Sequence, residues 1–248
     1  MSHPINDDER LAVYAAREIA DGEVVFVGIG IPSHAAVLAK RTHAPAATLV
    51  YESGAIGALP RTPPLSTGSP EVAAGAAMIA DSLTVFAELQ AGRIDVGMLS
   101  GAQVDLTGAL NSTVIGPYAH PKLRMVGSGG AHDIAMLARR VLILMPHEPR
   151  RFVRAVDFVT SPGLRANRAG TPARGPACVV TSRARFDFGE DGRLRLEAVR
   201  RGLDPADVVA ELDIGIEVAL VVREMPDPDP DILWVLRRDV LGQEATGV

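Results

Sequence analysis

The sequence has little of what marks secreted and membrane proteins. It contains one cysteine, Cys178, so an internal disulfide is excluded and a reducing compartment is favoured. No apolar run approaches the roughly 20 residues that a membrane-spanning helix requires. The N-terminal segment, Met1–Arg10, is polar and acidic, unlike a secretory signal. We therefore predict a cytoplasmic protein with no membrane partner.

Other absences narrow the chemistry. The formal net charge is -5, and no basic stripe is interleaved with the aromatic residues, which make up 4% of the chain, so no nucleic-acid partner is expected. None of the 6 histidines has HExxH spacing or a cysteine partner, so no metal site is predicted. The G-x-S-x-G motif of α/β-hydrolases and the G-x-x-x-x-G-K-[ST] motif of P-loop enzymes are both missing. We expect His120 and His147 to be structural, and Cys178, inside an apolar run, to be unreactive.

Hydrophobic patterns predict alternating helices and strands along one domain, residues 1–248. Asn6 and Glu9 form a capping pair in front of a helical pattern that continues to Gly22. Val24–Val27 is a continuous apolar run, which is typical of a strand buried on both faces of a parallel sheet.

The next segments complete a βαβ unit. The turn Gly28–Pro32 follows the first strand, Ser33 is expected to cap a helix, Ala35–Arg41, and a second strand covers Ala47–Val50. Further helices are predicted at Ser82–Gln90, in a segment that ends at Arg139, in a segment that begins at Asp204, and at Asp229–Leu241. Further strands are predicted at Ile94–Leu99 and Val141–Met145, followed by strand-like residues up to Val159. A hairpin pairs Phe186–Phe188 with Leu194–Leu196 across the turn Gly189–Gly192. The predicted fold class is α/β, an open, mostly parallel sheet flanked by helices, with a C-terminal hairpin extension.

An acidic residue, Glu52, stands where the second strand gives way to a loop of small residues. A carboxylate at such a place is poorly hydrated and open to a ligand, so it can act as a nucleophile or a general base. The alternative is that Glu52, Ser53 and Gly54 only form a turn, with the carboxylate in solvent.

Two glycine turns also follow predicted strands, and each has two interpretations. Gly28 and Gly30 match the start of a dinucleotide fingerprint, but Ser33 replaces its third glycine. The other interpretation is a sharp turn whose free amides can bind an anion or oxyanion. The run Gly127–Gly130 either lets a substrate lie against bare backbone or is a tight structural turn. Gln103 follows the strand Ile94–Leu99, at the edge where open α/β sheets place their ligands.

Taken in order, these motifs resemble the β subunit of family I CoA transferases, most nearly its glutaconate CoA-transferase branch. The resemblance covers roughly residues 8–225 and is carried by Gly28–Pro32, Glu52–Gly54, Gly101–Asp105, Gly108–Thr113, His120–Lys122, Gly127–Ala131 and Asp157–Gly163. It implies the CoA-transferase-like, or NagB/RpiA-like, form of the α/β fold.

The resemblance implies a ping-pong reaction at Glu52. The carboxylate would attack the thioester of an acyl-CoA to give an anhydride, and the released thiolate would return to form a glutamyl-CoA thioester. A second carboxylic acid would then take the CoA. Coenzyme A is thus implied as a substrate, with no cofactor bound permanently.

The family places its site between two subunits, so an α subunit is implied as the partner, in a heterotetramer or a larger assembly. The resemblance also implies that substrate, CoA or the oxyanion is bound by the backbone and polar groups that follow the strands. These are Gly28, Gly30, Ser53, Gly54, Gln103, Gly127, Gly129 and Gly130.

Three alternatives concern the reaction. Glu52–Gly54 reads Glu-Ser-Gly, which favours the glutaconate-like branch over the branch with Glu-Asn-Gly that acts on 3-oxo acids, although dicarboxylic and 3-oxo acids both remain candidate substrates. The same scaffold includes CoA-thioester hydrolases, ring-cleaving C–C hydrolases and decarboxylases, which have replaced the nucleophilic Glu that this chain retains. A non-catalytic assembly subunit is the third alternative.

Overall fold

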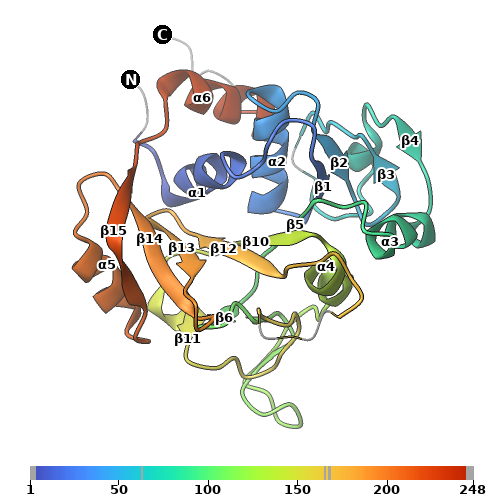
Figure 1. Ribbon diagram of the computed structural model, residues 1–248. Helices are drawn as coiled ribbons and strands as arrows, with labels where there is room; N and C mark the ends of the chain where they lie inside the picture. The colour runs from blue at the N-terminus through green and yellow to red at the C-terminus, as the bar shows by residue number, and fades with distance from the viewer. Residues whose placement is uncertain (1–3, 63, 165, 167–168, 244–248) are drawn as a thin grey trace.

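The structure is a computed structural model that describes residues 4–62, 64–164, 166 and 169–243. Within these residues a mixed 10-stranded sheet crosses the molecule in the order β15-β14-β13-β12-β10-β5-β1-β2-β3-β4 (Figure 1). Its centre is parallel and consists of β1 (Val24–Phe26), β2 (Thr48–Val50), β5 (Val96–Leu99), β10 (Arg140–Leu144) and β12 (Pro176–Val180).

Antiparallel pairing extends this centre at both ends. The strands are β3 (Ala55–Ile56) and β4 (Met78–Ile79) on one side, and β13 (Ala184–Phe188) and β14 (Leu194–Arg200) on the other, where β15 (Glu217–Met225) then adds in parallel. Small separate sheets contain β6 (Gln103–Asp105), β7 (Leu110–Asn111) and β11 (Phe152–Val153), and the pair β8 (Val114–Ile115) with β9 (Leu123–Arg124).

Helices cover both faces of the sheet. One face carries α1 (Asp7–Ala16), α2 (Ile31–Arg41) and α6 (Pro230–Val235), and the other carries α3 (Ser82–Gln90), α4 (Ala131–Leu137) and α5 (Pro205–Leu212). Short helical turns lie at Pro70–Ala73, Pro149–Arg151 and Leu236–Val240. No helix in the described part of the chain has the length and apolar character needed to cross a membrane.

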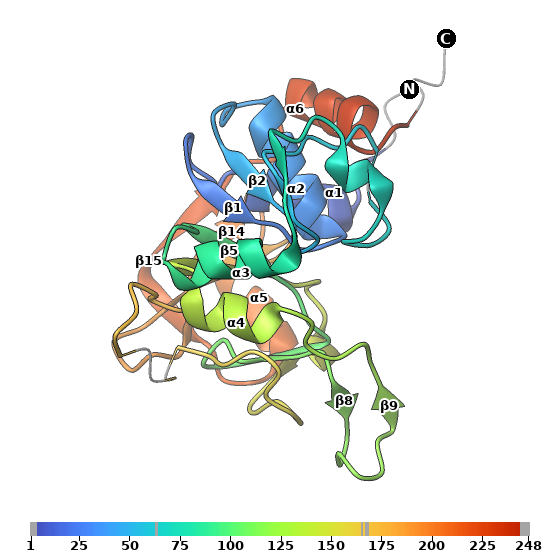
Figure 2. The ribbon, with the colours of Figure 1, turned by 90° about the vertical axis from the view of Figure 1, so that its right-hand side faces the viewer.

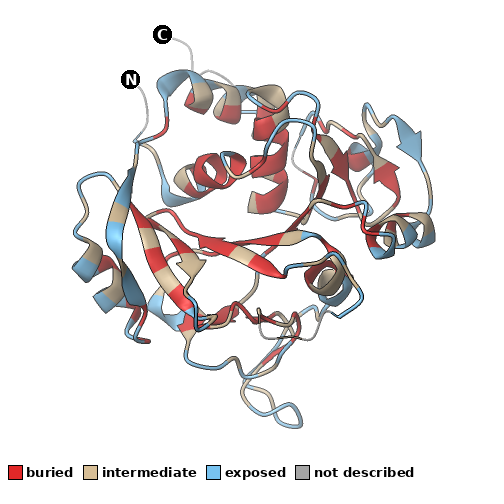
Figure 3. Ribbon diagram, viewed as in Figure 1, coloured by how far each residue is buried: buried red, intermediate tan, exposed pale blue. Residues whose placement is uncertain are grey.

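The sheet separates two hydrophobic cores. Successive strand residues point to opposite faces, so Val25 and Leu49 pack under α1 and α2, whereas Phe26 and Val50 pack under α3 and α4. Figure 3 shows the buried residues concentrated in the central strands and in the sheet-facing sides of the helices, while β15 and β4 are largely exposed. The layers thus leave the loops at the strand ends free to form a site.

The α/β prediction is confirmed, and so are several local predictions. Asn6 and Glu9 form a reciprocal capping box at α1, the helix Ser82–Gln90 has the predicted bounds, and Asp204 caps α5. The C-terminal hairpin pairs Phe186 with Leu196 as β13 and β14. These features depend on residues that are close in sequence.

Other local predictions are wrong. The first helix ends at Ala16 rather than continuing toward Gly22. Ser33 does not cap α2, because Gly30 at φ 79° starts the helix earlier and Pro32 fits its first turn. Residues 156–159 form no strand. The exposed strand β15 is missing from the prediction, although it adds nine residues to the sheet.

Candidate active site

Glu52 lies at the tip of a hairpin between β2 and β3. The N–H of Gly54 donates to the carbonyl of Tyr51 at 3.0 Å, and the N–H of Tyr51 donates to the carbonyl of Ala55 at 2.9 Å. Glu52 and Ser53 are therefore the central residues of a β-turn, and both are half-buried. The predicted turn is thus confirmed, whereas Glu52 is half-buried rather than fully in solvent, and its catalytic role stays a prediction.

Glycine is required at Gly54 for two reasons. Its φ is +110°, and a Cβ there would lie 2.1 Å from the carbonyl oxygen of Ala80. The Gly54 carbonyl also accepts a hydrogen bond from the N–H of Ala80 at 2.9 Å. This close backbone contact joins the Glu52 turn to the segment that leads into α3.

The residue that precedes the Glu52 turn is also held in place by a buried hydrogen bond. Tyr51 is fully buried, and its hydroxyl lies 3.1 Å from the hydroxyl of Ser33 in the first turn of α2. This contact fixes the end of β2 to the start of α2. Glu52 consequently extends from a rigid base.

The glycine run Gly127–Gly130 reaches the carboxylate from the other side. A Cβ on Gly129 would lie 3.7 Å from both Glu52 carboxylate oxygens, and a Cβ on Gly130 would lie 3.4 Å from the Glu52 carboxyl carbon. Gly129 has φ +47°, a conformation that favours glycine. The tertiary structure therefore brings two of the predicted glycines against the predicted nucleophile.

Hydrogen bonds hold this glycine run in place. Gly127, at φ +90°, donates its N–H to the carbonyl of Ser112 at 3.0 Å and accepts the Ser112 hydroxyl at 2.9 Å. At the other end the Gly130 carbonyl accepts the N–H of Ile134 at 3.0 Å as α4 begins. Figure 2 shows α4 lying beside α3, with the β8–β9 hairpin projecting from the body of the molecule.

Gln103 belongs to a buried support for this loop. Its side-chain oxygen accepts the Asn111 amide at 2.7 Å and the N–H of Asp157 at 3.0 Å, and its amide donates to the Asp157 carboxylate at 3.3 Å. Asn111 precedes Ser112, which holds Gly127. The structure therefore shows Gln103 bonded within the protein, and its predicted contact with substrate stays a prediction.

Gly28 and Gly30 lie at the end of β1, the strand beside β2. A Cβ on Gly28 would lie 3.0 Å from the carbonyl oxygen of Met98, so Gly28 allows the turn to pass close to β5. Gly30 has φ +79°, and a Cβ there would meet nothing within 4 Å. Its backbone is thus open at the same sheet edge as Glu52.

His147 and Cys178 are both buried, which fits the structural roles expected of them. The His147 ring lies 3.1 Å from the Thr181 hydroxyl and 3.3 Å from the Val208 carbonyl, and burial lowers its pKa. Burial raises the pKa of the Cys178 thiol to about 12, which leaves it protonated and unreactive at neutral pH. Among the described residues, no group of three or more His, Cys, Asp or Glu side chains is placed to hold a metal ion.

Sequence reasoning does not single out Phe86, which the structure places at the site. A Cβ on Gly130 would lie 2.4 Å from the Cζ atom of Phe86. On α3 the spacing of Phe86 with Val85 and Leu89 is that of an ordinary core position, so the sequence carries no signal for it.

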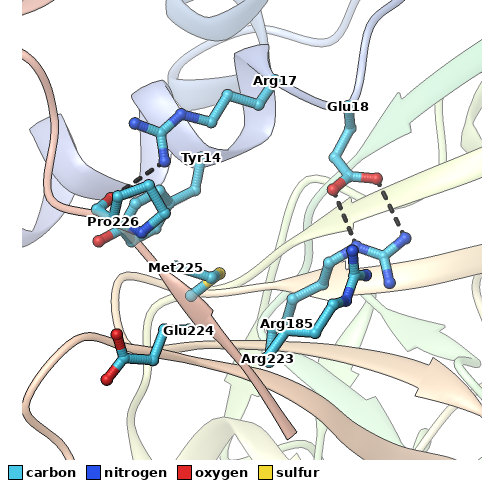
Figure 4. Close-up of a pocket in the computed structure, with 9 residues that line it drawn as sticks. Tyr14, Arg17, Glu18, Arg185, Arg223, Glu224, Met225 and Pro226 are labelled. Carbon is cyan, nitrogen blue, oxygen red and sulfur yellow. Dashed lines mark hydrogen bonds and ion pairs between the residues drawn. The ribbon is translucent and has the colours of Figure 1, made fainter.

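A cavity of about 180 Å³ lies between α1 and β15, at the end of the sheet far from Glu52 (Figure 4). It is lined by charged side chains that already have partners. Arg185 pairs with Glu18 at 2.8 and 3.1 Å and also with Glu197, and Arg17 donates to the Pro226 carbonyl at 3.0 Å. These charges join α1 to the sheet and leave little attraction for a ligand.

Comparisons with known proteins identify the family of this chain. The sequence profile described as coenzyme A transferase matches residues 8–199. The chain is 46% identical to the B subunit of 3-oxoadipate CoA-transferase from Pseudomonas knackmussii, covering 93% of this chain and 91% of that one. It is 36% identical to the B subunit of glutaconate CoA-transferase from Acidaminococcus fermentans, covering 94% and 91%.

Comparison with solved structures also gives a CoA transferase as a match. The crystal structure of glutaconate coenzyme A-transferase from Acidaminococcus fermentans matches with a TM-score of 0.88 at 34% identity, covering 98% of each chain. The decarboxylase AibA/AibB matches with a TM-score of 0.82 at 24% identity, over 96% and 95% of the two chains, which shows a shared fold alone. The α/β sheet is thus that of the CoA-transferase fold. The chain belongs to the coenzyme A transferase family.

Proposed function

We propose that this chain is the β subunit of a CoA transferase that works by ping-pong covalent catalysis at Glu52. The observation that carries the proposal is the meeting of the Glu52 carboxylate with the backbone of Gly129 and Gly130. A half-buried carboxylate that faces bare backbone can attack a thioester carbonyl whose oxygen is received by the neighbouring backbone amides.

In the first half-reaction a carboxylate oxygen of Glu52 attacks the acyl-CoA carbonyl carbon, and the C–S bond breaks to give an acyl-glutamyl anhydride and CoA thiolate. The thiolate then attacks the glutamyl carbonyl carbon and expels the carboxylate of the first acid. The product is a glutamyl-CoA thioester. A second carboxylate reverses these steps and leaves as its own CoA thioester.

Backbone amides would stabilise the charge that develops on the carbonyl oxygen. We propose Gly129 and Gly130 for this role, with Gly28, Gly30 and Ser53 along the path of CoA at the same sheet edge. Gly54 and Gly127 shape the two loops. Gln103 acts through the Asn111–Ser112 segment that holds Gly127.

The substrates we propose are a dicarboxylic acid and an acyl-CoA. The support is that two relatives of high coverage are named for 3-oxoadipate and glutaconate, both of which are dicarboxylates.

An α subunit is the proposed partner, since these relatives are named as the B subunits of their enzymes. Exposed apolar side chains flank the Glu52 turn, with Met78 47%, Ile79 62% and Leu83 78% exposed. An apolar rim next to a catalytic group suits a second subunit that would close the site.

The test is to co-express the chain with its α subunit and incubate the complex with acetyl-CoA or succinyl-CoA. The mass of the peptide containing Glu52 is measured, and glutaconate and 3-oxoadipate are added as acceptors. We expect a CoA adduct on Glu52 and a new CoA ester after the acceptor is added. Glu52→Gln should abolish both, and the matched change Glu71→Gln, at an exposed carboxylate, should leave both intact.

Other products would contradict the proposal. Free CoA without an adduct or a new ester would indicate a hydrolase, and release of carbon dioxide would indicate a decarboxylase. Full activity of Glu52→Gln would indicate a non-catalytic subunit.

A further inference from the structure

The ring of Phe86 and the carboxyl group of Glu52 both lie close to Gly130. A Cβ on Gly130 would lie 2.4 Å from Cζ of Phe86, 2.9 Å from its Cε1, and 3.4 Å from the carboxyl carbon of Glu52. The φ of Gly130 is -81°, which any residue can adopt, so contact with this ring is what requires glycine there. The end of the phenyl ring therefore reaches the space beside the reacting carbon.

Phe86 is held in this position by the aromatic ring of Phe26 and by the core packing of α3. Its ring packs against the ring of Phe26, with centroids 5.7 Å apart and planes tilted by 50°. Phe26 is only 1% exposed, and Val85 and Leu89 anchor the same helix in the core. Phe86 itself is half-buried, and Cζ and Cε1 at the end of its ring are the atoms near Gly130.

This placement gives the resting carboxylate no polar partner. A phenyl ring has no hydrogen bond to offer Glu52. The same ring becomes useful once the carboxylate is acylated on an oxygen, as in the anhydride, or its carbon is bound to the sulfur of CoA, because that carbon is then an electrophile that water can attack. Attack by water on glutamyl-CoA would regenerate the Glu52 carboxylate and release CoA thiol, ending the cycle without transfer.

We propose that Phe86 shields the carboxyl carbon of Glu52 from water and so sets the ratio of transfer to hydrolysis. It is a positioning and shielding residue, held against Gly130 by Phe26, and it takes no part in bond making. This inference rests on the proposed covalent reaction at Glu52, because only a covalent intermediate needs such protection.

The experiment uses the complex with its α subunit, succinyl-CoA as the donor and glutaconate or 3-oxoadipate as the acceptor. New CoA ester and free CoA are measured together, and their ratio is the readout. We expect Phe86→Ala to raise the ratio of hydrolysis to transfer by about tenfold or more, because the opened space admits water. Phe86→Met, which keeps most of the volume, should change the ratio by no more than about threefold.

Two further variants separate shielding from general stability. Phe186→Leu changes a fully buried phenylalanine in β13, far from Glu52 in the sheet order, and should lower the melting temperature without changing the ratio. Gly130→Ala should slow transfer because its Cβ displaces the ring. Adding Phe86→Leu, which removes the clashing ring atoms, should restore part of that rate.

The outcomes distinguish this inference from the proposed function. If the wild-type complex forms the CoA adduct on Glu52 while Phe86→Ala and Phe86→Met keep the wild-type ratio, the shielding role is overturned and the transferase mechanism stands. If the wild-type complex forms neither adduct nor new ester, both fail together. A raised ratio in Phe186→Leu would likewise contradict the shielding role, because loosened packing alone would then explain hydrolysis.

Discussion

The two ends of the large sheet differ in the kind of contact that holds them together. At the β2–β3 end, turns with glycine at positive φ bring backbone and a carboxylate into close contact around Glu52. At the β13–β15 end, ion pairs such as Arg195 with Asp187, at 2.6 and 3.0 Å, and the packed rings of Phe186 and Phe152 fasten strands together. We infer that the first end supplies activity and the second supplies stability. Substitutions at the two ends should therefore separate the two properties.

The largest effect is expected from Phe186→Ala at the stabilising end. Phe186 is 0% exposed and packs against Phe152 and His147, so its loss should cost about 3–5 kcal/mol of unfolding free energy. Denaturant unfolding of the purified complex measures this. Transfer per folded complex should be unchanged, and a specific loss of activity would break the comparison.

Glu52→Asp tests the catalytic end. The shorter side chain withdraws the carboxylate by about one bond from Gly129 and Gly130, and misplacement of about 1 Å in a reacting group typically costs on the order of 10²-fold in rate. Steady-state transfer with succinyl-CoA should fall by roughly that factor. The melting temperature should not change, and a large drop in it would show that Glu52 also stabilises the fold.

Gly30→Ala should affect both the stability of the fold and the binding of acyl-CoA. A residue with a Cβ at φ +79° is strained, so we expect a loss of about 1–2 kcal/mol in unfolding free energy. Because its Cβ would point into open space at the edge that holds Glu52, the KM for acyl-CoA should also rise. An unchanged KM would remove Gly30 from the proposed CoA path and leave it a structural glycine.

Glu9→Gln is the smallest change and concerns the helices that cover the sheet. Arg237 binds the Glu9 carboxylate at 2.6 and 2.9 Å and lowers its pKa, chiefly through these hydrogen bonds. A lowered pKa in the folded state means that this stabilisation is present above the unfolded value, about 4.3, and is lost as the pH falls through the folded value. Glutamine keeps the capping geometry and removes only the charge.

The expected loss for Glu9→Gln is therefore about 1 kcal/mol at pH 7, and it should shrink as the pH is lowered below 4. Urea unfolding curves at several pH values provide the measurement. A loss that is equal at all pH values would mean that the ion pair with Arg237 adds nothing to the cap.

Much of the fold could be predicted because its signals are local. The capping box at Asn6, the helix Ser82–Gln90 and the β13–β14 hairpin each depend on neighbouring residues. Ser33 shows where local reasoning is insufficient. It has the side chain of a helix cap, but Gly30 starts the helix earlier and frees the Ser33 hydroxyl to meet Tyr51.

The candidate site likewise has one part that the sequence predicted and another that only the structure revealed. The amino-acid sequence was sufficient to place Glu52 on a tight turn after a buried strand, because strand pattern and turn residues are read from adjacent positions. The folded structure was needed to show that Gly129 and Gly130 lie next to the carboxylate and that the Phe86 ring lies against Gly130. Strand order and the packing of α3 against α4 bring these residues together, and both depend on pairing between segments distant in the chain.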